Sequence, residues 1–257
     1  MKLKHKIIIG LVIFAVLAGF CIFVSTLRIT VAYTDENGKP TNADELGTFT
    51  VTFTGSSRYT DSELEKFFFE KGMDKNPVVF LFEQKFGEEK EIPFIETYDM
   101  EMISPTDYKI TIYDKSVVGY VEYMGSNMYL DKDGIVVESS TKVLEDVPLI
   151  SGIEYDYIVL HQKLPVENNK IFTVLLDVTQ QIEKYDIKTD KINISKELEI
   201  EINIGKVRVK LGTNNQLNEK MQDLADIIPK MLDVAGTLNM QEYNTLNSGY
   251  TFVKSED

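Results

Sequence analysis

Residues 48–72, TFTVTFTGSSRYTDSELEKFFFEKG, carry the signals of a strand followed by a helix. Up to Gly55, phenylalanine and valine alternate with threonine, which is the period of a strand with one buried face. Thr60 and Glu63 then have the spacing of a capping box, a reciprocal pair of side chains that begins many helices. Gly72 predicts the end of that helix. The stretch therefore favours a mixed α+β fold.

Three consecutive phenylalanines lie in the predicted helix. Leu64, Phe67 and Phe68 have the spacing i, i+3, i+4, so we expect Phe67 and Phe68 to face the core. Phe69 lies off that face and is expected to be less buried, as a candidate contact residue. The cluster is interpreted mainly as core packing.

The chain up to residue 115 continues the same small unit. The apolar run in residues 76–82, NPVVFLF, is too short for its period to distinguish a strand from a helix. Residues 96–103 and 108–114 alternate apolar and polar side chains, and each of them predicts a strand. Residues 48–115 together predict the order β–α–(α or β)–β–β.

Residues 116–254 predict a second domain, mostly antiparallel β with two or more helices. Its expected elements are strands over 117–124, 128–130 and 135–138, a loop over 147–152, a helix from Asn168 to Ile182, two or three strands over 185–211, a helix over 217–231 with a kink before Pro229, and a last strand over 249–254. Residues 255–257 are expected to form a short tail.

The acidic stretch in residues 129–138, YLDKDGIVVE, invites comparison with a calcium loop. An EF-hand loop needs glycine at its sixth position and glutamate at its twelfth. Counted from Asp131, the glycine comes two positions too early and Lys142 takes the place of the glutamate. Asp-Gly between apolar β runs is instead a strong hairpin signal. We therefore predict a turn and no metal site.

The N-terminal segment predicts a membrane anchor. Residues 7–27 contain no charged side chain, and at about 1.5 Å per residue they span the ~30 Å hydrocarbon core of a bilayer. Three lysines precede this segment and only Arg28 follows it closely, which places residues 1–6 in the cytoplasm and the rest of the chain outside. Residues 28–47, which include a polar stretch with Asn-Gly and a proline, are expected to be a linker.

Two other interpretations of this segment are weaker. A cleaved signal peptide has an apolar core of about 7–15 residues and a small-x-small cleavage site, to which residues 24–26 correspond poorly. A lipoprotein signal requires a small residue before its cysteine, whereas Phe20 precedes Cys21. A retained single-pass anchor in the cell membrane is therefore the prediction.

The charge of the exported part argues against several kinds of partner. The chain has 27 basic and 41 acidic residues; without the three N-terminal lysines, 24 basic residues stand against 41 acidic ones, a net charge of −17. Such a surface disfavours binding to nucleic acid and attraction to anionic lipid headgroups.

The sequence contains no enzyme signature. Cys21 is the only cysteine and lies in the apolar segment, and a catalytic triad would depend on His161, the only histidine outside the N-terminal tail. No histidine cluster is available for zinc. Pairs of acids arise by chance among 41, and the lack of tryptophan weakens a sugar-binding interpretation. We expect no catalytic residue, no metal and no cofactor.

Six stretches follow one another in the part of the chain after the apolar segment: FTVTFTG at 49–55, PTDYKITIYD at 105–114, YLDKDGIV at 129–136, VPLISG at 147–152, VRVKLG at 207–212 with Lys220 and Leu224, and GTLNM at 236–240. These stretches and their order resemble the motifs of the FtsQ/DivIB family of cell-division proteins. Asp114 and Asn239 depart from the family pattern, which has glutamate and aspartate there.

The resemblance implies a fold and a function. Residues 48–115 would be a POTRA-like domain of the FtsQ type, and residues 116–254 the β domain. The chain would be a non-enzymatic component of the division machinery at the septum, linked to the septal peptidoglycan synthase complex. Its partners would be FtsB/DivIC-like and FtsL-like single-pass coiled-coil proteins.

The resemblance also implies where those partners bind. A partner strand would add to the edge formed by the last strand, so that backbone hydrogen bonds supply affinity and alternate side chains supply selectivity. Carried onto this sequence, the edge comprises Tyr250, Thr251, Phe252 and Val253, with Tyr243 just before it. Arg208, on a neighbouring strand, would meet an acidic side chain of the partner. The alternative is that Phe252 and Val253 only pack the core.

A second class of function remains open at this point. A membrane-anchored exported module that binds a peptide or a wall fragment, as a sensor or a secretion accessory, would use the same strand addition without a role at the septum. The location of the protein in dividing cells discriminates between the two.

Overall fold

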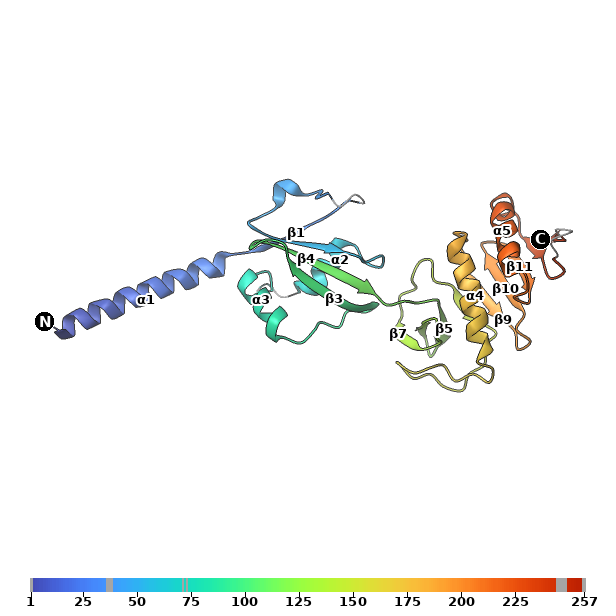
Figure 1. Ribbon diagram of the computed structural model, residues 1–257, viewed down its shortest axis with the longest axis horizontal. Helices are drawn as coiled ribbons and strands as arrows, with labels where there is room; N and C mark the ends of the chain where they lie inside the picture. The colour runs from blue at the N-terminus through green and yellow to red at the C-terminus, as the bar shows by residue number, and fades with distance from the viewer. Residues whose placement is uncertain (1, 36–38, 71, 73, 244–248, 256–257) are drawn as a thin grey trace. The chain divides into compact units, whose positions relative to one another are not determined.

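The computed structural model describes residues 2–35, 39–70, 72, 74–243 and 249–255, and Figure 1 shows its elements. These residues fall into two compact units, Met1–Lys115 (unit 1) and Ser116–Asp257 (unit 2), each with its own hydrophobic core. The fold is mixed α+β, as the sequence predicts. Residues 36–38 of the predicted linker and 256–257 of the predicted tail lie outside the described residues.

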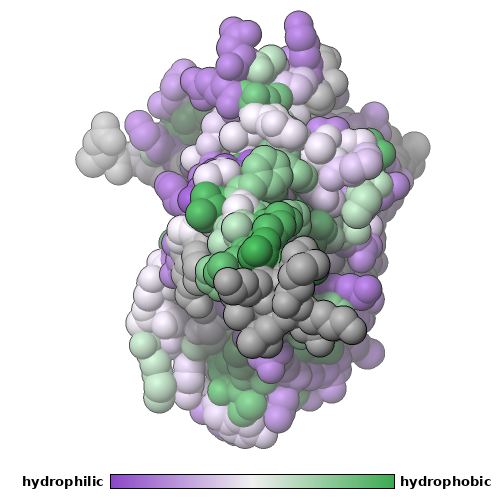
Figure 2. Space-filling view, turned by 90° about the vertical axis from the view of Figure 1, so that its left-hand side faces the viewer, coloured by the Kyte–Doolittle hydropathy of each residue, from purple (hydrophilic) through white to green (hydrophobic). Residues whose placement is uncertain are grey.

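The chain begins with helix α1, Lys2–Thr26. Its segment Ile8–Thr26 is long and apolar enough to cross a membrane, and none of it is buried within the protein. Apolar side chains gather in the middle of the face that Figure 2 presents, and the exposed apolar residues of the protein include many from α1. This is the apolar N-terminal helix that the sequence predicts.

Unit 1 contains a four-stranded sheet in the order β1-β2-β4-β3. Its elements are β1 Ile29–Ala32, the short 3₁₀ helix η1 Ala43–Glu45, β2 Phe49–Thr54, α2 Asp61–Phe68, α3 Pro77–Phe86, β3 Ile95–Met102 and β4 Asp107–Asp114. Strand β2 pairs in parallel with both β1 and β4, while β3 and β4 are antiparallel. The structure corrects the linker prediction, because β1 lies within residues 28–47 and its Ile29 and Val31 are buried.

The ambiguous run in residues 76–82 belongs to helix α3. Asn76 caps the helix by accepting hydrogen bonds from the backbone N–H groups of Val78 and Val79, and Pro77 occupies the first turn, where its missing N–H costs nothing. The capping box at Thr60 is also present, since Thr60 and Glu63 bond reciprocally at the start of α2.

The prediction for the three phenylalanines was wrong in part. Phe68 is buried as expected, but Phe69 is buried too, and Phe67 is the exposed one at 37%. The cause is the position of the helix end: α2 stops at Phe68, well before Gly72. Phe69 therefore leaves the helical period, and its ring packs 5.4 Å from that of Phe80 on α3, measured between centroids.

Unit 2 contains a nine-stranded sheet in the order β13-β12-β11-β10-β9-β8-β5-β6-β7. Its strands are β5 Gly119–Tyr123, β6 Ser126–Leu130, β7 Val136–Ser140, β8 Leu149–Ser151, β9 Lys191–Ile194, β10 Ile200–Ile204, β11 Val207–Gly212, β12 Gly236–Asn239 and β13 Thr251–Lys254; its helices are α4 Lys170–Lys184, α5 Leu217–Ile227 and the short 3₁₀ helix η2 Ile228–Lys230. Most neighbouring pairs are antiparallel; β5–β8, β8–β9 and β11–β12 are parallel. The predicted loop over 147–152 contains strand β8 instead, and β12 was not predicted as a strand.

The helices α4 and α5 lie on the same side of strands β9–β11 in Figure 1. Val178 of α4 and Leu224 of α5 share one buried cluster with Ile192, Ile202 and Val209 of the sheet. At about 25 cal/mol per Å² of apolar surface, burial of this kind is the main favourable term in folding. Helix α5 ends at Ile227 and η2 follows, so a break before Pro229 is present, but the α-helix is shorter than the predicted range 217–231.

The DKDG stretch forms a turn. The Oδ1 atom of Asp131 accepts hydrogen bonds from the N–H groups of Asp133 at 2.9 Å and Ile135 at 2.8 Å, and Gly134 supplies a φ of 79°. The carboxylate is thus engaged by the backbone of its own loop. In the described part of the chain, no group of three or more metal-ligating side chains comes together.

Candidate partner-binding edge

Strand β13 is the last strand at one edge of the sheet in unit 2. It covers Thr251–Lys254, within the last strand that the sequence predicts, and it pairs antiparallel with β12. An edge strand presents backbone N–H and C=O groups that a further strand can pair with.

The hydrogen-bond alternation identifies which residues of β13 face outwards. Ser255 donates its N–H to the carbonyl of Ala235 at 3.0 Å. In an antiparallel pair these bonds alternate along the strand, so Val253 and Thr251 also point their backbone groups at β12. Phe252 and Lys254 then point their N–H and C=O groups away from β12, where the described chain places no further strand.

The side chains of β13 divide between core and solvent. Phe252 packs against the main cluster of unit 2, whereas Val253 is 65% exposed. Gly236 on β12 permits this packing, because a Cβ atom there would lie 2.5 Å from Cζ of Phe252. Core packing therefore accounts for Phe252 but not for Val253.

The two tyrosines of the predicted site also pack against the hydrophobic core of unit 2. Tyr243 and Tyr250 are partly buried against it. The hydroxyl of Tyr243 donates to Oδ2 of Asp223 on α5 at 2.9 Å. Burial and this acidic neighbour raise the pKa of Tyr243. Tyr243 thus fastens the segment after β12 to α5.

Arg208 lies farther from the edge than the sequence analysis assumed. It is on β11, and β12 separates it from β13, because α5 carries the chain across to a parallel β12. Register nevertheless aligns Arg208, Thr237 and Val253 in one row across the three strands. The guanidinium Nε lies 3.0 Å from Oε1 of Glu201, so Arg208 already has an acidic partner, and its side chain remains 56% exposed.

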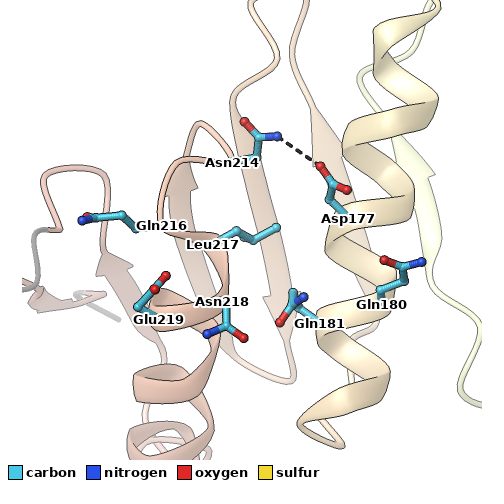
Figure 3. A pocket seen from close by; sticks show the side chains of 8 residues that line it. All are labelled: Asp177, Gln180, Gln181, Asn214, Gln216, Leu217, Asn218 and Glu219. Carbon is cyan, nitrogen blue, oxygen red and sulfur yellow. Dashed lines mark hydrogen bonds between the residues drawn. The ribbon is translucent and has the colours of Figure 1, made fainter.

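A pocket between α4 and the start of α5 was not predicted. It measures about 460 Å³ and is lined by Asp177, Gln180, Gln181, Asn214, Gln216, Leu217, Asn218 and Glu219. Figure 3 shows Asn214 and Asp177 facing each other across it, joined by a hydrogen bond of 3.1 Å from Nδ2 to Oδ2. The lining combines amides with two carboxylates and contains no nucleophile paired with a base. Polar side chains spread over α4, the loop before α5 and the first turn of α5 carry no sequence signal of such a pocket.

Comparison with protein families is informative for unit 2. The family model described as "FtsQ/DivIB, C-terminal related" matches residues 118–251, from just before β5 to the first residue of β13. The chain belongs to this family. Among curated proteins, none matches the chain. Residues 118–251 make up more than half of the sequence, so the FtsQ/DivIB assignment rests on the unit that carries the β13 edge.

Membership of the FtsQ/DivIB-related family has coarse consequences. It points to a role in cell division and to partners in the division complex, and the members of this family are non-enzymatic division proteins. Together with the apolar helix α1, it fits a single-pass membrane protein.

Proposed function

We propose that this FtsQ/DivIB-related protein is a non-enzymatic scaffold of the division machinery. Its exported part binds FtsB/DivIC-like and FtsL-like single-pass proteins and thereby helps recruit and regulate septal peptidoglycan synthesis. The single observation that supports the proposal most is the outward-facing backbone of Phe252 and Lys254 on edge strand β13. A partner strand paired there would extend the sheet and cross the row formed by Arg208, Thr237 and Val253.

The proposal extends to the domain organisation. In unit 1, the elements β2, α2, α3, β3 and β4 follow the POTRA-like order β–α–α–β–β, and β1 adds a strand beside β2. Unit 2 supplies the β domain. Residues 1–6 would face the cytoplasm and both units the outside.

The test of the edge removes one backbone N–H group that faces outwards. Lys254→Pro deletes the N–H that faces the partner, whereas the ladder to β12 uses Val253 and Thr251, so proline is tolerated at this edge position. We expect at least about a tenfold loss of affinity for the exported segment of an FtsB/DivIC-like partner, measured by calorimetry. Lys254→Ala is the matched control, because it keeps the N–H and should bind as the wild type does.

Two side-chain variants probe selectivity. Val253→Lys and Arg208→Glu alter the exposed row without touching the core, and each is expected to weaken partner binding. Phe252→Lys is unsuitable as a test, because the Phe252 ring packs against the core and its loss would disturb the fold. Unchanged affinity in Lys254→Pro, Val253→Lys and Arg208→Glu would refute this interface.

The cellular role is tested by location. A fluorescent fusion at the N-terminus is expected to form a ring at mid-cell in dividing cells. A uniform membrane signal would contradict the septal role and favour the exported peptide- or wall-binding module instead.

A further inference from the structure

Helix α3 exposes an apolar stripe that unit 1 does not cover. Val78, Phe82 and Phe86 follow one another at four-residue spacing and are 51%, 63% and 67% exposed. The rings of Phe82 and Phe86 lie 5.1 Å apart, measured between centroids. The opposite side of α3 is engaged, since Phe80 is buried in the core of unit 1. Exposed aromatic residues gathered on one helix face mark an interaction surface.

The start of α3 is joined to the outer end of α1. The Nδ2 atom of Asn76 donates to the carbonyl oxygens of Val24 at 2.8 Å and Leu27 at 3.4 Å, which belong to the last turn of α1 and the residue after it. The same side chain caps α3 through its Oδ1 atom. Ile29, just beyond α1, donates its N–H to the carbonyl of Lys75 at 2.7 Å. Helix α3 therefore begins beside the C-terminal end of α1, which is the end nearer the outer surface of the membrane in the proposed topology.

The direction of α3 keeps its whole length close to the level at which α1 ends. In Figure 1, α3 runs across the direction of α1 rather than along it. The interfacial layer between hydrocarbon and water is about 5–7 Å thick on each side of a bilayer. Side chains that project from α3 at the end of the apolar segment Ile8–Thr26 are therefore within reach of this layer.

We propose that Val78, Phe82 and Phe86 insert into the outer interfacial layer of the same bilayer that α1 crosses. The proposal rests on the membrane anchor proposed above and adds a second contact, parallel to the membrane surface. Amphipathic helices with phenylalanine on the apolar face bury that face in this way. Lys85 borders the stripe, with Nζ 5.5 Å from the centre of the Phe86 ring, so its stem can lie along the apolar surface while its charge stays in water.

The contact is driven by apolar burial and not by charge. The exported part carries an excess of acidic residues, so anionic lipid does not attract it. Insertion is accordingly expected to be no stronger in vesicles that also contain phosphatidylglycerol than in vesicles of phosphatidylcholine alone.

The absence of tryptophan from the chain gives a direct test. Single variants Phe82→Trp and Phe86→Trp of the full chain are reconstituted in vesicles whose phosphatidylcholine carries bromine on the upper part of the acyl chains, which quenches tryptophan emission on contact. Phe20→Trp, in α1, reports whether the anchor spans the bilayer. Tyr113→Trp replaces an exposed ring on β4, whose buried side faces the helices, and serves as the aqueous control.

The expected result is quenching at positions 82 and 86 that is several-fold greater than at position 113, with emission shifted to shorter wavelength. Quenching at position 20 but none above the control at 82 and 86 would overturn the docking while leaving the anchor intact. No quenching at position 20 would overturn both. Emission at 82 and 86 that responds to protein density but not to brominated lipid would assign the stripe to a second copy and overturn the proposal as well.

Discussion

Lys220 carries its ammonium group into the interior of unit 2, where only 1% of the residue is exposed. Its Nζ donates to the carbonyl oxygens of Leu211 at 2.6 Å and Thr213 at 3.2 Å, at the turn from β11 into α5. Burial disfavours the charged form and lowers the pKa of Lys220 below its ordinary value of 10.5. Lys220, which the sequence analysis groups with VRVKLG at 207–212, thus acts as a clamp that holds the β11–α5 connection together.

Replacing Lys220 tests this clamp. Lys220→Met leaves the carbonyls of Leu211 and Thr213 without their donor, and we expect the free energy of unfolding to fall by about 1–3 kcal/mol, measured by urea denaturation. Because the folded pKa lies below the unfolded one, the wild type gains stability relative to the variant as pH rises from the folded pKa towards 10.5. Lys230→Met, at an exposed position, should change neither quantity; a pH-independent difference for Lys220→Met would contradict the argument.

Glu65 links three segments of unit 1. It accepts hydrogen bonds from the Tyr33 hydroxyl, just after β1, and from the Lys75 ammonium, just before α3. Burial works to raise the pKa of Glu65, but these two donors outweigh it and lower that pKa below 4.5. The same contact with Glu65 raises the pKa of Tyr33 to about 12.

At acidic pH, protonation of Glu65 should weaken its interactions with Tyr33 and Lys75. A carboxyl group whose folded pKa is lowered stabilises the fold above its unfolded pKa, and the contribution is lost as pH falls through the folded value. Glu65→Gln is therefore expected to destabilise unit 1 by about 1–2 kcal/mol at neutral pH, with the difference from wild type shrinking below pH 4.5. Urea denaturation across pH measures it, and Glu101→Gln, exposed on β3, is the control. A difference that persists unchanged in acid would exclude the ionic account.

At the scale of elements, the caps decide where helices begin. The capping box at the start of α2 joins Thr60 and Glu63 through both side chains. Thr60→Ala removes one half of it, and we expect a loss of about 1 kcal/mol in the stability of unit 1. Thermal denaturation measures the loss. Ser62→Ala, two residues later and exposed, should leave the melting temperature within experimental error, and an equal effect of both variants would argue against the cap.

The predictability of the elements follows from where their stabilising contacts lie. The capping box, the DKDG turn and the amphipathic helix α4 are encoded by neighbours in the sequence, and all three are present. Strands β1, β8 and β12 have three or four residues each and are defined by parallel partners far along the chain. So short a segment has too few side chains for a period of two to be recognised.

The candidate partner-binding edge was also predictable only in part. The last strand was predictable from alternation, but the side of β13 that faces outwards depends on its register with β12, which the sequence did not identify as a strand. The ion pair between Arg208 and Glu201 joins the two strands of a hairpin, and it could not be predicted from the sequence either. Family resemblance supplied the location of the edge; the structure supplied its direction.

At the scale of the whole molecule, two separate cores should unfold separately. Ile110 belongs to the cluster of unit 1 and Ile202 to that of unit 2, and both are fully buried. Ile110→Ala and Ile202→Ala are each expected to cost about 2–5 kcal/mol. In a urea titration followed by hydrogen exchange, each variant should weaken protection in its own unit only. A shared loss of protection in both units would show that they unfold as one.

The short connection between α1 and β1 has a mechanical consequence. Only Leu27 and Arg28 separate the helix from a strand that is paired with β2 and held by the carbonyl of Lys75. Membrane-spanning helices change their tilt when the thickness of the bilayer changes. In the membrane topology proposed above, this two-residue connection would pass such a tilt directly to strand β1. The thickness of the bilayer would then affect the orientation of the sheet in unit 1.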